Sequence, residues 1–487
     1  MQKHTGIETD KLDLHVDLDG SLLKCDLLHE QFLYLLMHNP LAFIQSWFVL
    51  FQGKAAFKQF VANHTTLENR EFPANQELLE WLRVESHNFR ATYLITASPQ
   101  SWADEIKKRY GFIKSAHGST KDRNLKGSEK AKFIQEHFKN DFVYVGNSFS
   151  DLEIWKHAKG AVVVGSDSLK NKCSQVTSVL KQIEPKNGLK VLFKALRVHQ
   201  WAKNALVFLP LILAQNWFDV NAWTQALLAA VAFSLTASSV YLLNDLVDLE
   251  SDRKHSSKFK RPFASGNMSI LSGVLLIPLV LIAGVFVGFN VGLPFLEVLI
   301  GYYFLTTIYS FWLKKHLFID AITLGCLYSI RIVAGGVATE TPLSHWLLAF
   351  STFFFLSLAL VKRYTEIKEK ADSNANKLTS KISGRGYRIE DLNTVLGLGL
   401  GSGMVSILVF TLYLNDPAVV EKLKHPTILW ASSLLLLYWL GRVWFLASRG
   451  DMHDDPVVFA VKDKVSWFII FLVGINFVFA AGALGFI

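Results

Sequence analysis

The chain has 487 residues, of which 51% are hydrophobic, and it carries a formal net charge of +9. Its mean hydropathy of +0.27 excludes an ordinary soluble protein, but the first third is polar, so we expect a soluble part and a membrane part. The bases lie mainly in loops between apolar runs, which favours anionic lipid or phosphate partners, and we expect no nucleic acid. Cys25, Cys173 and Cys326 are scattered, which excludes a disulfide framework and a cysteine metal site.

Residues 1–185 have the pattern of a soluble α/β domain. Short apolar runs that predict strands alternate with longer stretches that predict helices, and this alternation is typical of a parallel, Rossmann-like sheet. The predicted strands lie near 12–16, 93–95, 142–145 and 161–164, and the predicted helices near 24–63, 99–110 and 127–137. A polar linker, residues 181–190, ends this domain.

Residues 186–487 have the pattern of an all-α, polytopic membrane domain. Nine apolar runs have about the length that a bilayer requires, and we expect a bundle of nine transmembrane helices. They lie near 203–217, 222–243, 269–288, 292–312, 319–338, 346–361, 394–414, 427–447 and 466–486.

Lysine and arginine gather in alternate loops of this domain. They are abundant at 253–261, 314–315, 362–388 and 442–464 and missing near Asn216, Asn290 and Glu340, with Lys422 and Lys424 as the exception. We take the soluble domain as cytoplasmic, which satisfies the positive-inside rule, and we expect an integral protein of a cytoplasmic (inner) membrane whose long polar loops lie on the side of the soluble domain.

A row of acids follows the second apolar run. Asp245, Asp248 and Asp252 are three and four residues apart, which places three carboxylates on one face of a helix. Carboxylate oxygens are ligands that suit Mg²⁺, and the bases that follow suit phosphate: Lys254, Lys258, Lys260 and Arg261. The sequence therefore indicates a metal-diphosphate site, although a solvated loop between spans remains the alternative.

Other charged groups lie at the same ends of the spans. Lys203 follows Trp201 at the first span, Lys362-Arg363-Tyr364-Thr365-Glu366 ends the sixth, and Arg449, Asp454 and Asp455 lie between the eighth and ninth. Arg331 lies inside the fifth span, where a charge is costly. Phosphate binding competes with simpler interpretations: Lys203 as an interfacial anchor, Arg331 paired with a carbonyl, and Lys362-Arg363 as a topology signal, although Glu366 adds nothing to topology.

The motif Asn244-Asp245-x-x-Asp248-x-x-x-Asp252-Arg253, followed by Lys258 and Arg261-Pro262, resembles the first Asp-rich motif of the UbiA prenyltransferase superfamily. The resemblance covers about residues 190–487. It implies a bundle of nine transmembrane helices with a Mg²⁺-diphosphate site at the cytoplasmic end of a central cavity. Typical members have a second Asp-rich motif after the sixth span, where this chain has Lys362 to Glu366.

Further motifs are similar to one branch, the decaprenyl-phosphate phosphoribosyltransferases: Arg197-x-x-Gln200-Trp201-x-Lys203-Asn204, Asp245 to Gly266, Arg331-x-x-Ala334-Gly335-Gly336 and Lys362-Arg363-Tyr364-x-Glu366. This implies Mg²⁺-dependent transfer of 5-phosphoribose from phosphoribosyl diphosphate to a polyprenyl phosphate. A basic segment suits the phosphates of both substrates. The alternative is transfer of a prenyl group from a prenyl diphosphate to a hydrophobic acceptor, beside a non-catalytic soluble module.

The resemblance implies roles for individual residues. Asp245 and Asp248, with Asp252, would hold Mg²⁺ on the donor diphosphate. The substrate-binding residues would be Lys203, Asn244, Lys258, Arg261, Lys362, Arg363, Tyr364 and Glu366.

A second acidic motif, Asp17-Leu18-Asp19-Gly20-Ser21, follows the first predicted strand. Two acids at a strand end can act as nucleophile and acid/base with a shared Mg²⁺. With Thr96, Lys130 and Gly146-Asn147-Ser148-x-x-Asp151, the order resembles the haloacid dehalogenase superfamily of phosphatases across about residues 10–175.

The second resemblance implies a phosphatase with a helical cap near residues 24–75. Asp17 would be the nucleophile and Asp19 the acid/base, Thr96 and Lys130 would hold phosphate, and the metal residues would be Asp17, Asp19, Asn147 and Asp151. The family usually has Asp where this chain has Asn147, so a domain kept as a scaffold is the alternative.

Overall fold

The computed structural model describes residues 9–138, 141–184, 188–373, 382, 384–416, 420, 423–452 and 455–482. The chain forms two compact units, which we name the sheet unit (Met1–Leu196 and Leu242–Leu276) and the helical unit (Arg197–Tyr241 and Ile277–Ile487). The division falls inside two long helices, α11 (Val220–Val247) and α13 (Ile270–Val291). The expected domain boundary at 185/186, Lys422 and Asp454 lie outside the described residues.

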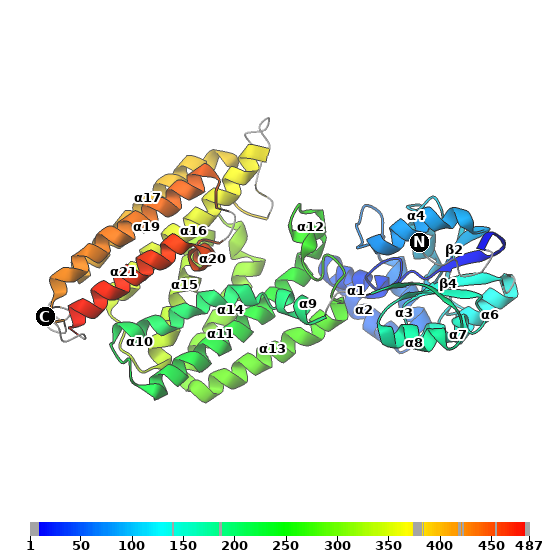
Figure 1. Ribbon diagram of the computed structural model, residues 1–487, viewed down its shortest axis with the longest axis horizontal. Helices are drawn as coiled ribbons and strands as arrows, with labels where there is room; N and C mark the ends of the chain where they lie inside the picture. The colour runs from blue at the N-terminus through cyan, green and yellow to red at the C-terminus, as the bar shows by residue number, and fades with distance from the viewer. Residues whose placement is uncertain are drawn as a thin grey trace. The chain divides into compact units, whose positions relative to one another are not determined.

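The sheet unit is built on six parallel strands in the order β3-β2-β1-β4-β5-β6 (Figure 1). The strands are β1 (Asp13–Val16), β2 (Ala91–Pro99), β3 (Ser115–Ser119), β4 (Phe142–Gly146), β5 (Gly160–Val164) and β6 (Val179–Ile183). Strands β2 and β3 are added on one side of β1, and β4, β5 and β6 are then added on the other side. The order therefore reverses beside β1, and such a switch point leaves a crevice at the carboxyl ends of the strands.

Residues of the central strands alternate between two cores. In β4, Val143 and Val145 pack into the core on one face of the sheet, and Phe142 and Tyr144 pack into the core on the other. Because successive side chains of a strand point to opposite faces, an unbroken apolar run is what a sheet covered on both faces requires. The α/β architecture that the sequence predicted is confirmed.

Helices complete the sheet unit. They are α1 (Leu27–His38), α2 (Pro40–Leu50), α3 (Lys54–Asn63), α4 (Gln76–Glu85), α5 (Gln100–Lys107), α6 (Ser128–His137), α7 (Leu152–Trp155), α8 (Asp167–Ser174), α9 (Gly188–Ala195) and α12 (Leu249–Lys254). The single helical stretch expected over 24–63 is three helices, because Asn39-Pro40 starts a new helix and Gly53 takes a φ of 109°.

The helical unit consists of long apolar helices, seen in Figure 1 as extended rods. With parts of α11 and α13, they are α14 (Leu293–Phe311), α15 (Ile319–Ala338), α16 (His345–Ser373), α17 (Leu392–Tyr413), α19 (Trp430–Arg449) and α21 (Lys464–Ala481), with the shorter η4 (Val198–Phe208), α10 (Leu209–Leu213) and α20 (Pro456–Lys462). Over the described residues, eight helical segments are long and apolar enough to cross a membrane.

Eight of the nine expected spans coincide with these segments, although residues 483–486 of the last lie outside the described ones. The expected span at 203–217 is not confirmed. Its residues form the 3₁₀ stretch η4 and the five-residue α10, and Gln215 turns the chain with a φ of 62°. Lys203 and Asn204 are buried in η4, so this segment brings polar groups into the protein.

Candidate functional site

Two acids follow β1 at the carboxyl edge of the sheet. Asp17 Oδ1 accepts a hydrogen bond of 2.6 Å from the Lys130 ammonium, which also donates to the Tyr144 hydroxyl at 3.0 Å. Burial raises the pKa of Asp17 to about 7, even though Lys130 acts in the opposite direction. An acid and a lysine from distant parts of the sequence are thus held in one buried pair.

The carboxylate of Asp19 is fully engaged by hydrogen-bond donors. Its Oδ1 accepts from the backbone N–H of Leu27 at 2.9 Å, and its Oδ2 accepts from the hydroxyls of Ser98 at 2.7 Å and Thr96 at 3.2 Å. Because β2 pairs with β1, with Val16 opposite Leu94, the carboxyl-terminal part of β2 lies beside the residues that follow β1 at the switch point. Ser98 belongs to this cluster and was not predicted, although the hydroxyl pair Thr96-Ala97-Ser98 was visible in the sequence.

Residues after β4 reach the same edge. Asp151 Oδ2 accepts from the backbone N–H groups of Asn147 (3.0 Å) and Ser148 (2.9 Å), so this carboxylate holds the loop. The Asn147 amide lies against Gly20, where an added Cβ would stand 2.0 Å from its Nδ2. Only glycine, here with a φ of 78°, allows the loop after β1 to approach the loop after β4 this closely.

The metal interpretation of this edge has mixed support. Two buried carboxylates near one ammonium leave negative charge that a cation would neutralise, and oxygen donors suit Mg²⁺. Over the described residues, however, no three Asp, Glu, His or Cys side chains are grouped to hold a metal. Asp19 and Asp151 accept hydrogen bonds from protein donors in this structure.

The acid row is not one straight helical face. Asp245 lies in the last turn of α11. Asp248 adopts a non-helical backbone (φ −87°, ψ 9°) as the N-cap of α12, which contains Asp252. Arg261 Nη1 contacts Asp245 Oδ1 at 3.1 Å and Asp252 Oδ2 at 2.6 Å, and both carboxylates are 2% exposed. Two carboxylates therefore converge on one guanidinium. Their charge and oxygen donors suit a metal ion, although among the described residues they are not grouped with a third acid to hold one.

The structure gives Arg261 partners that the sequence did not predict. The sequence predicted a phosphate ligand, whereas the guanidinium is paired with two acids of the row. The physical reason is that two buried carboxylates repel each other, and the nearest base neutralises them. Two other substrate-binding residues were predicted near the acid row: Lys258 is exposed, and Asn244, in α11, is half-buried.

A buried ion pair anchors the acid row within the sheet unit. Arg253 donates to both oxygens of Glu30 in α1, at 3.0 and 2.6 Å, and to the Glu71 carbonyl at 3.1 Å. The side chains of Arg253 and Glu30 are 5% and 1% exposed. Arg253 directly follows Asp252, and α1 begins at Leu27, which binds Asp19, so one helix connects the two acidic clusters.

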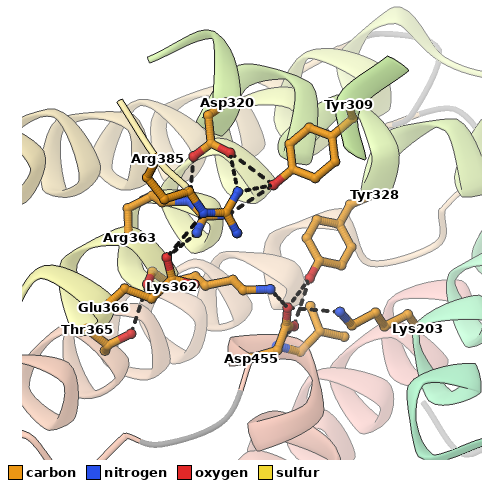
Figure 2. A network of polar contacts seen from close by, with 11 residues as sticks. Lys203, Tyr309, Asp320, Tyr328, Lys362, Arg363, Thr365, Glu366, Arg385 and Asp455 are labelled. Carbon is orange, nitrogen blue, oxygen red and sulfur yellow. Dashed lines mark hydrogen bonds and ion pairs between the residues drawn. The ribbon is translucent and has the colours of Figure 1, made fainter. Parts of the chain in front are cut away.

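In the helical unit, basic side chains surround one buried carboxylate, which Figure 2 shows at the centre of its lower cluster. Asp455 Oδ2 accepts from Lys203 at 2.9 Å and Lys362 at 3.0 Å, and Tyr328 donates to Oδ1 at 2.7 Å. Burial alone would raise the pKa of Asp455, but Lys203 and Lys362 hold it well below its usual range. With Asp455 ionised, the two lysines leave this cluster, which we name the Asp455 cluster, with net positive charge.

Arg331 stands beside this cluster and is fully engaged. Its Nε donates to Asn204 Oδ1 at 2.8 Å and its Nη2 to the Tyr302 hydroxyl at 3.1 Å, and it also binds the Leu327 carbonyl. One turn further along α15, Gly335 lets η4 approach closely: an added Cβ would meet the Val207 carbonyl oxygen at 2.0 Å. The small residue thus permits the contact that places Lys203 and Asn204, as small residues do between membrane helices.

Arg363 and Glu366 belong to a separate network, in the upper part of Figure 2. Arg363 Nε lies 2.6 Å from Asp320 Oδ2, and another nitrogen of the guanidinium binds Glu366. Arg385 contacts Asp320 Oδ1 at 3.0 Å. The charges of the two arginines and the two acids balance, and Arg363 is 1% exposed. Because its members come from α15, α16 and the segment before α17, this network joins these three parts of the chain.

Two expectations for the segment 362–366 are therefore corrected. Arg363, expected to receive phosphate, is saturated by carboxylates, and Tyr364, expected to bind substrate, is buried against the Trp444 ring with centroids 5.8 Å apart. Adjacent residues of a helix point about 100° apart, so consecutive residues cannot share one site. Lys362 alone of the three reaches the Asp455 cluster.

Several residues of these clusters carried no assigned role in the sequence analysis. Asp455 had been noticed only as a charge between spans, and Arg331 as a charge that a phosphate or a carbonyl could pair; of their partners, Lys203 lies 252 positions from Asp455 and Asn204 lies 127 positions from Arg331. Asp320, Tyr328 and Glu30 gave no signal, because an isolated acid or tyrosine in an apolar helix has no distinguishing spacing.

Comparison with known proteins agrees with the helical architecture. A model of the UbiA prenyltransferase family matches residues 205–472. The chain is 38% identical over 477 residues to an uncharacterized protein, y4nM, of Sinorhizobium fredii, covering 96% of this chain and 91% of that protein. The match to y4nM thus includes both the sheet-forming and the helical regions.

Two other relatives match a shorter part. Nodulation protein NoeC of Azorhizobium caulinodans is 32% identical over 289 residues, covering 59% of this chain and 92% of NoeC. A decaprenyl-phosphate phosphoribosyltransferase of Mycolicibacterium smegmatis is 29% identical over 304 residues, covering 61% and 94%. Together with its eight apolar helices, the family match makes this chain an integral membrane protein that belongs to the UbiA prenyltransferase family.

Proposed function

We propose that this chain transfers 5-phosphoribose from phosphoribosyl diphosphate to a polyprenyl phosphate. The observation that carries this proposal is the Asp455 cluster, in which Lys203 and Lys362 surround one carboxylate where typical family members have a second acidic motif. A second acidic motif suits another metal ion, whereas net positive charge suits a substrate phosphate. The similarity to a protein named decaprenyl-phosphate phosphoribosyltransferase supports the same assignment.

The acid row is assigned to the donor. Asp245, Asp248 and Asp252 would hold Mg²⁺, which neutralises the charge of the diphosphate as it leaves. Arg261, which now neutralises two of these acids, would share them with the metal and contact the diphosphate together with Lys258. Asn244 precedes the row and could donate to the ribose or the diphosphate.

The Asp455 cluster is assigned to the other phosphates. Lys203 and Lys362 would bind the lipid phosphate or the ribose 5-phosphate, while Asp455 and Tyr328 fix the position of both ammonium groups. An oxygen of the lipid phosphate forms the new bond to C1 of ribose, the C1–O bond to diphosphate breaks, and diphosphate leaves with its electron pair. Attack from the opposite face inverts the anomeric centre. Catalysis is then positioning and charge stabilisation, without a protein nucleophile.

Glu366 and Arg363 take a positioning role in this proposal. Their network with Asp320 and Arg385 holds the end of α16, from which Lys362 projects. Tyr364 is assigned to packing. Lys362 is then the residue of the segment 362–366 that contacts substrate.

We further propose that residues 1–185 form a phosphatase domain of the haloacid dehalogenase type and residues 186–487 the transferase domain. Asp17 would attack phosphorus and form an aspartyl-phosphate, Asp19 would protonate the leaving oxygen, and water would then hydrolyse the intermediate. Lys130 and Thr96 would hold phosphate oxygens, and Asn147 and Asp151 would contribute to Mg²⁺ binding. The meeting of three motifs at the switch point supports this assignment. Its substrate class would be a sugar phosphate or the lipid product.

We place the acid row, the Asp455 cluster and the sheet edge on the cytoplasmic side of a bacterial cytoplasmic membrane, because the lysine- and arginine-rich loops lie at those ends of the spans. The donor is a soluble cytoplasmic metabolite in this proposal, and the acceptor is a lipid.

The deciding experiment presents purified full-length protein with two donors. Labelled phosphoribosyl diphosphate is offered with polyprenyl phosphate and Mg²⁺, and labelled prenyl diphosphate is offered with a hydrophobic acceptor. We expect label in the lipid fraction from the first donor only. Transfer from prenyl diphosphate alone would establish the alternative, a prenyltransferase with a non-catalytic sheet domain.

A further inference from the structure

A large cavity in the sheet unit lies outside both acidic clusters. Its volume is about 900 Å³, within the range of small-molecule sites. Its wall combines residues that follow α3, residues of α9, and residues from Arg253 to Asn267. The carboxylates of the acid row are not part of this wall, so the cavity is a separate feature.

The wall of the cavity is basic and partly aromatic. Phe72 and Phe259 supply apolar surface. The lysines come from three segments of the chain: Lys24, Lys190, Lys194 and Lys260. Among the described residues of the wall the one acid is Glu71. The Lys194 ammonium donates to the Lys260 carbonyl at 2.7 Å, and the charge of Arg253 is matched by Glu30. Lysine ammonium groups on flexible stems suit a phosphate, and the aromatic rings suit the apolar part of the same ligand.

Helix α9 connects this wall to an apolar surface. Lys190 and Lys194 are four residues apart and line the cavity on one side of the helix. Leu189 and Phe193, also four apart, lie on the neighbouring side and are 68% and 55% exposed. A short helix with lysines beside exposed large apolar side chains is typical of a segment at a membrane surface.

A second segment of the sheet unit presents the same kind of surface. Helix α2 exposes Leu41, Ile44, Trp47 and Phe48, which are between 53% and 73% exposed, and Phe51 follows at 91%. In a chain whose described residues include eight apolar spans, such exposed apolar side chains favour a membrane surface as the neighbour of α2.

We propose that the cavity between α9 and residues 253–267 binds the phosphate-bearing headgroup of an anionic membrane lipid. The lysines hold the phosphate, the aromatic rings contact the glycerol or first isoprene carbons, and the acyl or prenyl chain leaves past Leu189 and Phe193. This assignment does not rest on the transferase proposal, since it concerns binding alone. It predicts that the site selects lipid phosphate over free phosphate, because the apolar wall contributes only with a lipid.

The test measures protection of a cysteine in the cavity wall. Val191 lines the cavity, so Val191→Cys is made in a full-length chain in which the exposed Cys326 is replaced by Ser; Cys25 and Cys173 are buried. Ser174→Cys on α8, exposed and outside the wall, is the matched reporter. Maleimide labelling is followed in vesicles of phosphatidylcholine alone, with added phosphatidylglycerol, with added polyprenyl phosphate, and with free ribose 5-phosphate.

We expect the phosphate lipids to slow labelling of the cysteine at 191 severalfold, less so at high salt, and to leave the cysteine at 174 unaffected. Lys190→Gln together with Lys194→Gln should abolish the protection, whereas Lys156→Gln, at an exposed lysine that directly follows α7, should not. Labelling that is the same in all vesicles would overturn the proposal. Equal protection by ribose 5-phosphate would assign the cavity to a soluble phosphate ester instead.

Discussion

The two charged clusters assigned to transfer are built with opposite signs. In the sheet unit, two buried carboxylates, Asp245 and Asp252, converge on the Arg261 cation. In the helical unit, Lys203 and Lys362 converge on the carboxylate of Asp455. The first arrangement can exchange its central cation for a metal ion, and the second can add an anion to its surplus of positive charge.

This difference teaches why a departure from a family motif is informative. A basic segment, Lys362 to Glu366, in place of an acidic one changes the sign of the site, and under the proposed function its ligand would be an anion and not a metal. A transferase whose two substrates both carry phosphate needs one site of each sign. A variant that alters one cluster should therefore change its dependence on Mg²⁺ or on anionic substrate, but not both.

The largest effect is expected at the acid row. Asp245→Asn should lower transfer by roughly 10²–10³-fold, because it removes a buried negative charge with little change in shape. The check is lipid-linked product formed against Mg²⁺ concentration. Glu297→Gln, on an acid of α14 outside these clusters, is the control and should behave as the unmodified chain. Full activity of the Asp245 variant would exclude the row as the metal site.

An equally complete loss is expected for a different activity at the sheet edge. Asp17→Asn should reduce phosphate release to background, because an amide cannot attack phosphorus, while ribosyl transfer continues. Free phosphate and lipid-linked phosphoribose are measured in the same reaction. Unchanged release would remove Asp17 as nucleophile, and no release from the unmodified chain across sugar phosphates and the lipid product would favour a scaffold.

The Asp455 cluster should respond through substrate affinity. Lys362→Gln should raise the KM for the phosphate substrate contacted there about 10–100-fold, as expected when a hydrogen bond to a charged group worth ~1.5–3 kcal/mol is lost. The Mg²⁺ concentration for half-maximal rate should stay unchanged. Lys315→Gln removes the same charge from a loop and should leave KM unaltered. A shift in the Mg²⁺ requirement instead would contradict an anion site.

The ion pair that anchors the acid row gives the smallest effect on chemistry and a clear one on stability. Glu30→Gln leaves Arg253 charged and buried without its partner, so we expect a loss of about 3–5 kcal/mol in the free energy of unfolding. The drop in Tm of the purified protein measures it. Replacing both residues, Glu30→Met with Arg253→Met, should recover much of the loss. The exposed pair Arg123–Glu136 provides the control, with no measurable change for Glu136→Gln.

The sheet was predictable where its strands are central. The apolar runs at β4 and β5 are buried on both faces, so the sequence carries a clear signal there; β1 is also buried, although it alternates polar and apolar residues (Asp-Leu-His-Val). The outer strands β3 (Ser-Ala-His-Gly-Ser) and β6 (Val-Leu-Lys-Gln-Ile) were not predicted. An edge strand pairs on one side only and tolerates polar residues, so its composition resembles that of a loop.

The acidic motifs and their bases, by contrast, were visible as spacing within a few residues. The partners of those residues were not. Lys130 lies 113 positions from Asp17, and Asp455 lies 252 positions from Lys203. Local periodicity cannot encode such pairs, and it gave no sign of the carboxylate partners of Arg261 and Arg363, which only the folded chain supplies.

By itself, the sequence determined that this chain has an α/β part, a series of apolar spans and acidic motifs at the ends of hydrophobic runs, because each is written in neighbouring residues. The tertiary structure decided which charges meet. The segment 203–217 does not form a span but brings Lys203 and Asn204 into the protein interior. Lys362 and Arg363 belong to different networks, and Arg253 pairs with Glu30. The physical reason is that a buried charge is stable only beside its partner, and only the folded chain brings that partner within reach.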